Sequence, residues 1–122
     1  MKRNYELIRE ILIAVEQHPA AANTISLKTT QFADKFPKIT DDEMNDHIQM
    51  LADENFLSGE PHQFGRFITK LTWKGHDFIE QSKSETVWAK TKHVAGHLAL
   101  GAFFAVLNNA AVLHAQSLLT SG

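Results

Sequence analysis

Three histidines near the carboxyl end have the spacing in this chain that comes nearest to a metal site. His93 and His97 stand four positions apart, so on a helix both imidazoles can lie on one face, and His114 follows later. Two histidines do not complete a tetrahedral zinc site, and no cysteine or nearby carboxylate is there to finish it. We therefore expect no metal site and no cofactor, and histidines partly buried in a segment that avoids charge.

The adjacent carboxylates Asp41 and Asp42 are the pair that could do general acid–base work. Such a pair needs a pocket that separates the two pKa values. Here they lie between Thr40 and Glu43, which have the spacing of a helix capping box, so a role in the first turn is favoured. The sequence also has no glycine-rich phosphate loop, no Gly-x-Ser-x-Gly elbow and no His-Glu-x-x-His motif. We predict that the protein is not an enzyme and has no catalytic residues.

Length and composition indicate one small globular protein. The 122 residues suffice for a single core, and 43% hydrophobic with 21% charged residues is ordinary for a folded chain. The absence of cysteine fits a reducing compartment. Charged residues at Glu6, Arg9 and Glu10 interrupt the apolar pattern that a secretory signal would need. We expect a cytoplasmic location.

The first half of the chain predicts helices and one short strand. An apolar face at helical spacing predicts a helix over 4–17, and alternation predicts a short strand over 24–27. A short helix over 29–36 is expected to end before Pro37. The Thr40 capping box predicts a helix over 40–54.

The next segment predicts a β-hairpin that leads directly into a helix. Strands are expected from Phe56 and over 66–71, joined by a loop over 59–65. Thr72 is a suitable N-cap for the following helix, and Gly75 would let its first turn press closely against the hairpin. The order helix–strand–helix–helix–β-hairpin–helix predicts an α+β, mostly helical fold of the winged-helix type.

The carboxyl-terminal third predicts an apolar helical arm. Ser84 can cap a helix, a last helix is expected over 102–119, and no Asp, Glu, Lys or Arg occurs from His93 to Gly122. One small domain cannot cover such an arm, so we predict a winged-helix domain over 1–83 and an oligomerisation arm over 84–122. The apolar residues expected to carry self-association, into a homodimer or a larger assembly, are Val94, Leu98, Phe103, Phe104, Leu107, Val112 and Leu113.

A weaker alternative is that this apolar arm associates with a membrane. Its uninterrupted apolar run, Leu98 to Leu107, is shorter than the roughly 20 residues that a spanning helix needs. We therefore expect no membrane partner.

Several stretches resemble one family of phage and prophage proteins, grouped as domain of unknown function 2513. The most specific is Leu71-Thr72-Trp73-Lys74-Gly75-His76-Asp77-Phe78, followed by Val87-Trp88-Ala89-Lys90, and the resemblance covers about residues 1–92. It implies a winged-helix-like fold and a phage context, hence a host-cell cytoplasm, but no activity. We expect Trp73 to pack the hairpin onto the first helix and His76 to bond a backbone carbonyl.

Charge patterning favours a protein partner. The helix predicted over 40–54 has no Lys or Arg, and its acidic residues are Asp41, Asp42, Glu43, Asp46, Asp53 and Glu54. Such a face would steer towards a basic surface, and the phage context extends the hypothesis to an inhibitor of a host protein.

DNA is the alternative partner. Winged helices commonly read DNA with the helix before the hairpin, and phosphate contacts supply much of the affinity. The acidic helix would be repelled there, so a DNA-binding regulator would have to use a basic wing. The residues for that alternative are Lys2, Arg3, Arg66, Lys70 and Lys74.

Overall fold

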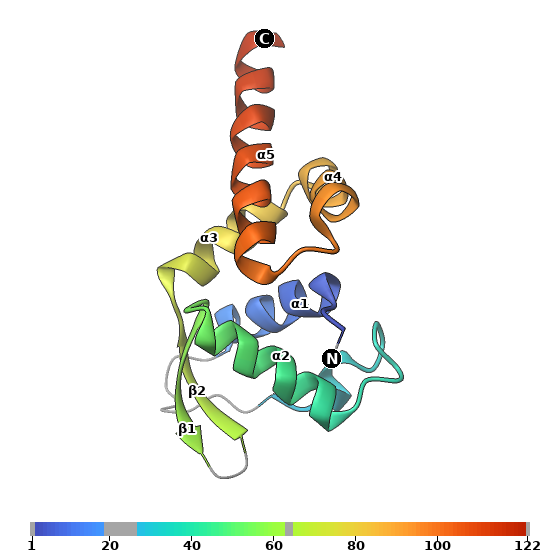
Figure 1. The fold of residues 1–122 in the computed structure, drawn as a ribbon, viewed down its shortest axis with the longest axis vertical. Coiled ribbons are helices and arrows are strands. Elements are labelled where there is room, and N and C mark those ends of the chain that lie inside the picture. The colour runs from blue at the N-terminus through green and yellow to red at the C-terminus, as the bar shows by residue number, and fades with distance from the viewer. Residues whose placement is uncertain (1, 19–26, 63–64, 122) are drawn as a thin grey trace. The chain divides into compact units, whose positions relative to one another are not determined.

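The structure is a computed structural model that describes residues 2–18, 27–62 and 65–121, with side chains described except at 60–62, 65–69 and 121 (Figure 1). Its contacts divide the chain into two compact units, Met1–His76 and Asp77–Gly122. Within the described ranges the fold is α+β and mostly helical, with one two-stranded antiparallel sheet. The predicted domain boundary after residue 83 lies between two helices and stays a prediction.

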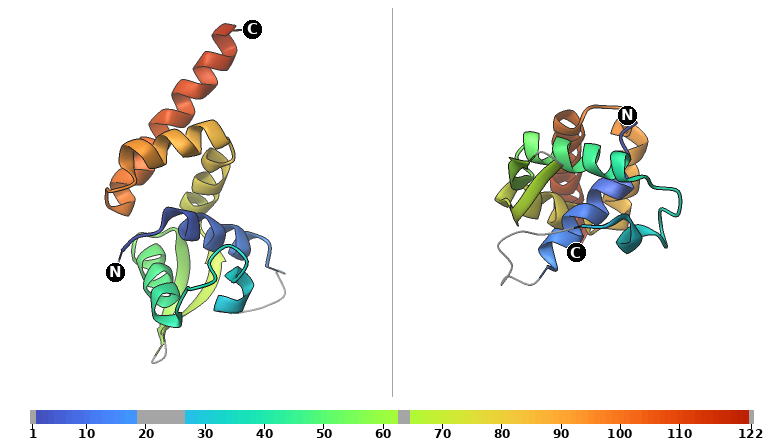
Figure 2. Two further views of the ribbon diagram at one scale, coloured as in Figure 1. Left: turned by 90° about the vertical axis from the view of Figure 1, so that its right-hand side faces the viewer. Right: turned by 90° about the horizontal axis from the view of Figure 1, so that it is seen from below.

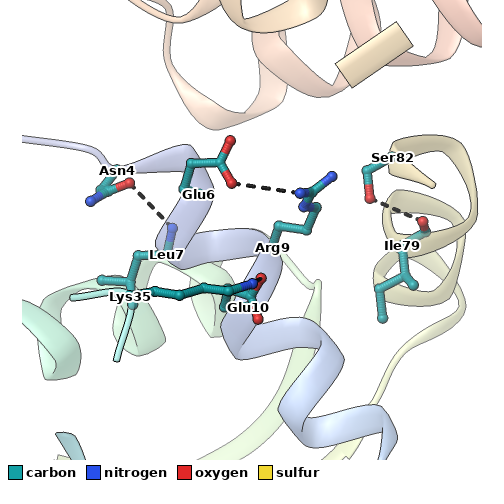
Figure 3. Close-up of polar contacts among 8 residues, drawn as sticks. All are labelled: Asn4, Glu6, Leu7, Arg9, Glu10, Lys35, Ile79 and Ser82. Carbon is teal, nitrogen blue, oxygen red and sulfur yellow. Dashed lines mark hydrogen bonds and ion pairs between the residues drawn. The ribbon is translucent and has the colours of Figure 1, made fainter. Parts of the chain in front are cut away.

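Helix α1, Tyr5–Glu16, confirms the first predicted helix. Asn4 caps it, because its Oδ1 accepts the backbone N–H of Leu7 at 3.2 Å (Figure 3). The face at helical spacing is buried. His47 fastens the cap from a second helix: its Nε2 accepts the backbone N–H of Asn4 at 3.0 Å, while Nδ1 lies 2.7 Å from the carbonyl oxygen of Glu43. Since Nε2 is the acceptor, the proton of this neutral imidazole is on Nδ1.

The segment 27–39 runs beside α1. It contains a short 3₁₀ helix, η1, Thr29–Phe32, in place of the longer helix predicted over 29–36. An ion pair of 2.7 Å between Lys35 Nζ and Glu10 Oε1 joins this segment to α1 (Figure 3). The strand predicted over 24–27 lies outside the described residues except for Leu27, which is coil.

Helix α2, Asp41–Asp53, confirms the predicted capping box. Thr40 Oγ1 accepts the N–H of Glu43 at 3.1 Å, and the Glu43 carboxylate accepts the N–H of Thr40 at 3.4 Å. The helix ends at Asp53, and two residues later Asn55 has a left-handed φ of 66°, a conformation that asparagine tolerates better than most residues. The buried face of α2 consists of Met44, His47, Ile48 and Leu51.

The hairpin is longer than expected. Strand β1, Leu57–His62, pairs antiparallel with β2, Gly65–Leu71, and the register shifts between Ser58 and Gly59. The loop predicted over 59–65 was therefore too long, because pairing continues through Pro61 and Arg66. Proline is tolerated there since each strand of a two-stranded sheet has one free edge. Helices α1 and α2 pack on this hairpin to form the core of the first unit.

Helix α3, Trp73–Ser82, follows strand β2 directly, as predicted. Thr72 Oγ1 accepts the N–H of Gly75 at 3.1 Å, which is the expected cap. A Cβ added at Gly75 would lie 2.4 Å from the carbonyl oxygen of Phe56 and 2.5 Å from Leu71 Cδ1. The predicted close approach of this turn to the hairpin is confirmed.

The second unit is built on aromatic packing. Helix α4, Glu85–Ala95, is capped by Ser84 as predicted, and α5, Leu100–Ser121, extends the predicted last helix at both ends. Trp88 lies edge-on to Phe78 and Phe103, with ring centroids 5.8 and 5.6 Å away. Helices α4 and α5 pack together over the first turns of α5, and the later turns extend beyond α4 (Figures 1 and 2).

Replacing Gly75 with alanine should lower the free energy of unfolding by about 1–3 kcal/mol, because backbone or core atoms must move to admit the Cβ. Gly101→Ala is the matched control: nothing lies within 4 Å of its added Cβ, and alanine favours a helix over glycine by about 1 kcal/mol. Thermal unfolding at low protein concentration measures both. Equal effects at the two glycines would contradict the close approach at Gly75.

Candidate functional site

The acidic surface of α2 is the first candidate site. All six predicted acidic residues are exposed, in two groups. Asp41, Asp42 and Glu43 occupy the first turn, where the helix dipole favours negative charge, and Glu43 is engaged in the cap. Asp46, Asp53 and Glu54 lie further along the helix.

A shallow hollow of about 440 Å³ lies on this acidic surface. Its lining residues are Arg3, Asp46, Gln49, Met50, Asp53 and Glu54. Three carboxylates against one guanidinium leave a formal charge of −2 there (−3 + 1). Gln49 Nε2 holds both carboxylate oxygens of Asp53 at 3.1 Å, which orders one side of the hollow. A lysine or arginine side chain is the kind of group that this lining suits.

Trp73 lies at the surface, and its predicted role was wrong. The side chain is 84% exposed and does not pack the hairpin onto α1. The helical periodicity of α3 explains this exposure. The buried face of the helix consists of Gly75, Phe78, Ile79 and Ser82, and Trp73 lies on the opposite side. Reading that periodicity from the sequence would have placed Trp73 outside.

The imidazole ring of His76 lies beside the indole ring of Trp73. Its ring centroid lies 5.5 Å from that of Trp73. Its Nδ1 lies 3.5 Å from Glu16 Oε2 in α1, so the predicted bond to a backbone carbonyl was wrong. A half-exposed imidazole therefore borders the indole, and a carboxylate lies on that imidazole.

Two hydrogen bonds bring Trp73 to the carboxyl end of α2. Thr72 Oγ1 donates to the carbonyl oxygen of Asn55 at 2.6 Å, and Lys74 Nζ donates to that of Glu54 at 3.0 Å. Trp73 lies between these two anchors in the chain. The residues on both sides of Trp73 in the chain are thus anchored at the end of α2, and we call the exposed Trp73 with Asp46, Asp53 and Glu54 the acidic–Trp surface.

The residues predicted for DNA come from three different parts of the first unit: the segment before α1, strand β2 and the start of α3. Arg3 lines the acidic hollow, and Lys2 is exposed just before α1. Lys70 is exposed on β2, and the side chain of Arg66 lies outside the described ones. Lys74 donates to Glu54 and lies 4.6 Å above the ring centre of Phe56.

The residues predicted for self-association divide into buried and exposed sets. Phe103 and Leu107 are fully buried in the chain itself, and Leu98 and Phe104 are half-buried. Val94, Val112 and Leu113 are more than half exposed. On length and composition α5 could also cross a membrane over Leu100–Thr120, with 11% of that stretch buried. A core helix would be mostly buried, so the outer part of α5 lacks a cover within the described chain.

The histidines of the arm lie apart along the chain. Helix α4 ends at Ala95, so His97 is beyond the helix that contains His93, and His114 belongs to α5. Within the described ranges no group of three or more His, Asp or Glu side chains could hold a metal ion.

Comparison with known proteins gives the family but no activity. The profile described as "Hypothetical protein (DUF2513)" matches residues 2–100. The chain belongs to this family. An uncharacterized protein of Haemophilus influenzae is 25% identical over 96 residues, covering 75% of this chain and 76% of the relative. No solved structure matches the chain. Most of α5 lies beyond the region that the DUF2513 profile matches.

The two tryptophans should respond oppositely to truncation. Trp73→Ala should change the free energy of unfolding by no more than about 0.5 kcal/mol, because the side chain is 84% exposed. Trp88→Ala should cost about 3–5 kcal/mol, because that side chain is 1% exposed and packs on two aromatic rings. Thermal melts monitored by circular dichroism measure both. A large loss of stability in Trp73→Ala would make Trp73 a packing residue.

Proposed function

We propose that this protein is a non-enzymatic interaction module that binds a basic protein through the acidic–Trp surface and self-associates through its C-terminal helices. The carboxylate-lined hollow of α2 is the observation that carries the proposal. The exposed indole of Trp73 adds to it, since the neighbouring residues Thr72 and Lys74 are hydrogen-bonded to the end of α2. The first unit then serves as a winged-helix scaffold acting in the cytoplasm.

Tryptophan and carboxylates together suit a partner rich in arginine or lysine. An indole face attracts a cation, and tryptophan is enriched among the residues that dominate binding energy. Asp46, Asp53 and Glu54 would pair with further cationic groups and accelerate encounter by electrostatic steering. A basic surface on a nucleic-acid-binding protein has this chemistry, which is where an inhibitor of a host protein would act.

The exposure of Trp73 favours a role in binding over a role in holding the fold together. A side chain that is 84% exposed contributes little to folding, although two hydrogen bonds fix the backbone on either side of it. A tryptophan side chain can bury a large apolar area on binding a partner. That arrangement is typical of an anchor residue.

DNA binding is the second candidate, and exposed Lys70 on β2 is the observation in its favour. The helix before the hairpin, which would enter the groove, has exposed carboxylates and no Lys or Arg. Lys74 is already engaged with the end of α2. The charges of this surface thus favour a basic protein over a phosphate backbone.

Neutralising the hollow should weaken binding to the partner. The variant is Asp46→Asn with Asp53→Asn and Glu54→Gln, and the immobilised chain is the bait for proteins of the producing cell. A genuine partner should be retained by the wild type, released by raised salt, and bind the variant at least about tenfold more weakly, equivalent to about 1.4 kcal/mol. Trp73→Ala should weaken the same partner by about 2 kcal/mol or more.

The matched control neutralises three exposed acids outside the acidic–Trp surface: Asp34→Asn, Glu80→Gln and Glu85→Gln. It changes the net charge by the same amount and should leave binding intact. Equal losses in both triple variants would mean that net charge, rather than the acidic–Trp surface, governs retention. Unchanged binding in both would refute the proposed surface.

A further inference from the structure

Six residues of α5 form a stripe along one side of the helix. Their successive spacings are four, three, four, three and four residues, which is the repeat of a coiled-coil seam. All are exposed except one half-buried member. We call this stripe the α5 seam, and it comprises Gly101, Ala105, Asn108, Val112, Ala115 and Leu119.

The α5 seam differs from the face that α5 uses within its own unit. Leu100, Phe103 and Leu107 are buried and cover the aromatic core with Trp88. Val112 and Leu119, on the seam, are 55% and 84% exposed. The helix therefore has one satisfied apolar face and one unsatisfied face.

We propose that the α5 seam pairs in parallel with the α5 seam of a second copy of this chain. The proposal deepens the self-association proposed above and rests on it. It names the interface, the orientation and the residue that sets the register.

Small residues at the beginning of the α5 seam favour a close helix–helix contact. A Cβ at Gly101 would meet no atom within 4 Å, so nothing within the described chain requires glycine there. A second helix approaching over Gly101 and Ala105 would use that missing side chain.

Asn108 supplies the polar position of the seam. Its Oδ1 is buried and has no hydrogen-bond partner within the described residues. In parallel pairs a single asparagine on the seam faces its counterpart and fixes register and helix number. An antiparallel pair would instead place Asn108 opposite Val112, leaving the amide against an apolar side chain.

The absence of charged residues in α5 favours a second copy of this chain as the partner of the α5 seam. Helix α5 has no charged residue, so an identical helix meets it without burying or opposing any charge. Seam periodicity is also what a partner helix requires, whereas a bilayer surrounds a helix on all faces. Asn108, Asn109, His114 and Gln116 would have to enter the hydrocarbon if α5 crossed a membrane.

The size of the α5 seam sets the expected strength. The helix has 22 residues and is about 33 Å long, which gives about three heptads. Three heptads are near the lower limit for a stable coiled coil, so the dimer should dissociate on dilution.

A matched pair of neighbouring residues tests the face. Val112 and Leu113 are 55% and 51% exposed, but Leu113 lies about 100° further around the helix, off the α5 seam. Sedimentation of the full-length chain over a concentration series should show a dimer for the wild type and Leu113→Glu. Val112→Glu should weaken dimerisation at least about tenfold. Equal effects, or a loss only in Leu113→Glu, would overturn the α5 seam.

Cysteine cross-linking tests the orientation, and the native chain has no cysteine to interfere. Ala105→Cys and Ala115→Cys should each form a disulfide-linked dimer alone, while Ser117→Cys, exposed on the opposite side of α5, should not. Cross-linking only when Ala105→Cys and Ala115→Cys are mixed would overturn the parallel pairing.

Two further outcomes would overturn the second copy as the occupant. One is a wild type that stays monomeric at every concentration, which would also refute the proposed self-association. The other is co-flotation of the wild type with phosphatidylcholine vesicles, which would assign α5 to a bilayer. Neither affects the acidic–Trp surface, because retention of a basic partner by the Val112→Glu variant tests that surface separately.

Discussion

The close approach of Gly75 to the carbonyl oxygen of Phe56 is the contact that fixes the first unit. An added Cβ would lie 2.4 Å from that oxygen, so only glycine admits the start of α3 at this distance. The N–H of Thr72 lies 3.3 Å from the same oxygen, and its hydroxyl donates to Asn55. The end of α2, the base of the hairpin and the start of α3 therefore meet at one point, with Trp73 held at the surface beside them.

This junction also explains how packing and binding divide along one short segment. Within Thr72-Trp73-Lys74-Gly75-His76, the threonine, lysine and glycine face α2 and the hairpin. Trp73 and His76 are left towards solvent with Glu16. This short segment thus contains both the residues that build the junction and the exposed aromatic that we assign to a partner. The apolar arm has the same duality, with a buried face around Phe103 and an exposed seam around Val112.

Local signals in the sequence were sufficient for most elements. The Thr40–Glu43 capping box, the Thr72 and Ser84 caps and the apolar spacing of α1 each involve residues within a few positions, and all are confirmed. The hairpin length was missed because Pro61 was read as a loop residue, although an edge position accepts it. The acidic hollow could not be foreseen, since Arg3 joins its lining from another part of the chain. The contact of Glu16 with His76, the ring neighbour of Trp73, likewise joins residues 60 positions apart.

Titration of a labelled DNA duplex, followed by fluorescence anisotropy across a salt series, tests the central claim that the acidic–Trp surface serves a protein partner. The account predicts flat anisotropy even at low salt, because exposed carboxylates cover the helix that would face the phosphates. Tight binding that falls steeply with salt, and that is lost on combining Arg66→Ala with Lys70→Ala but kept when Asp46, Asp53 and Glu54 are neutralised, would contradict it.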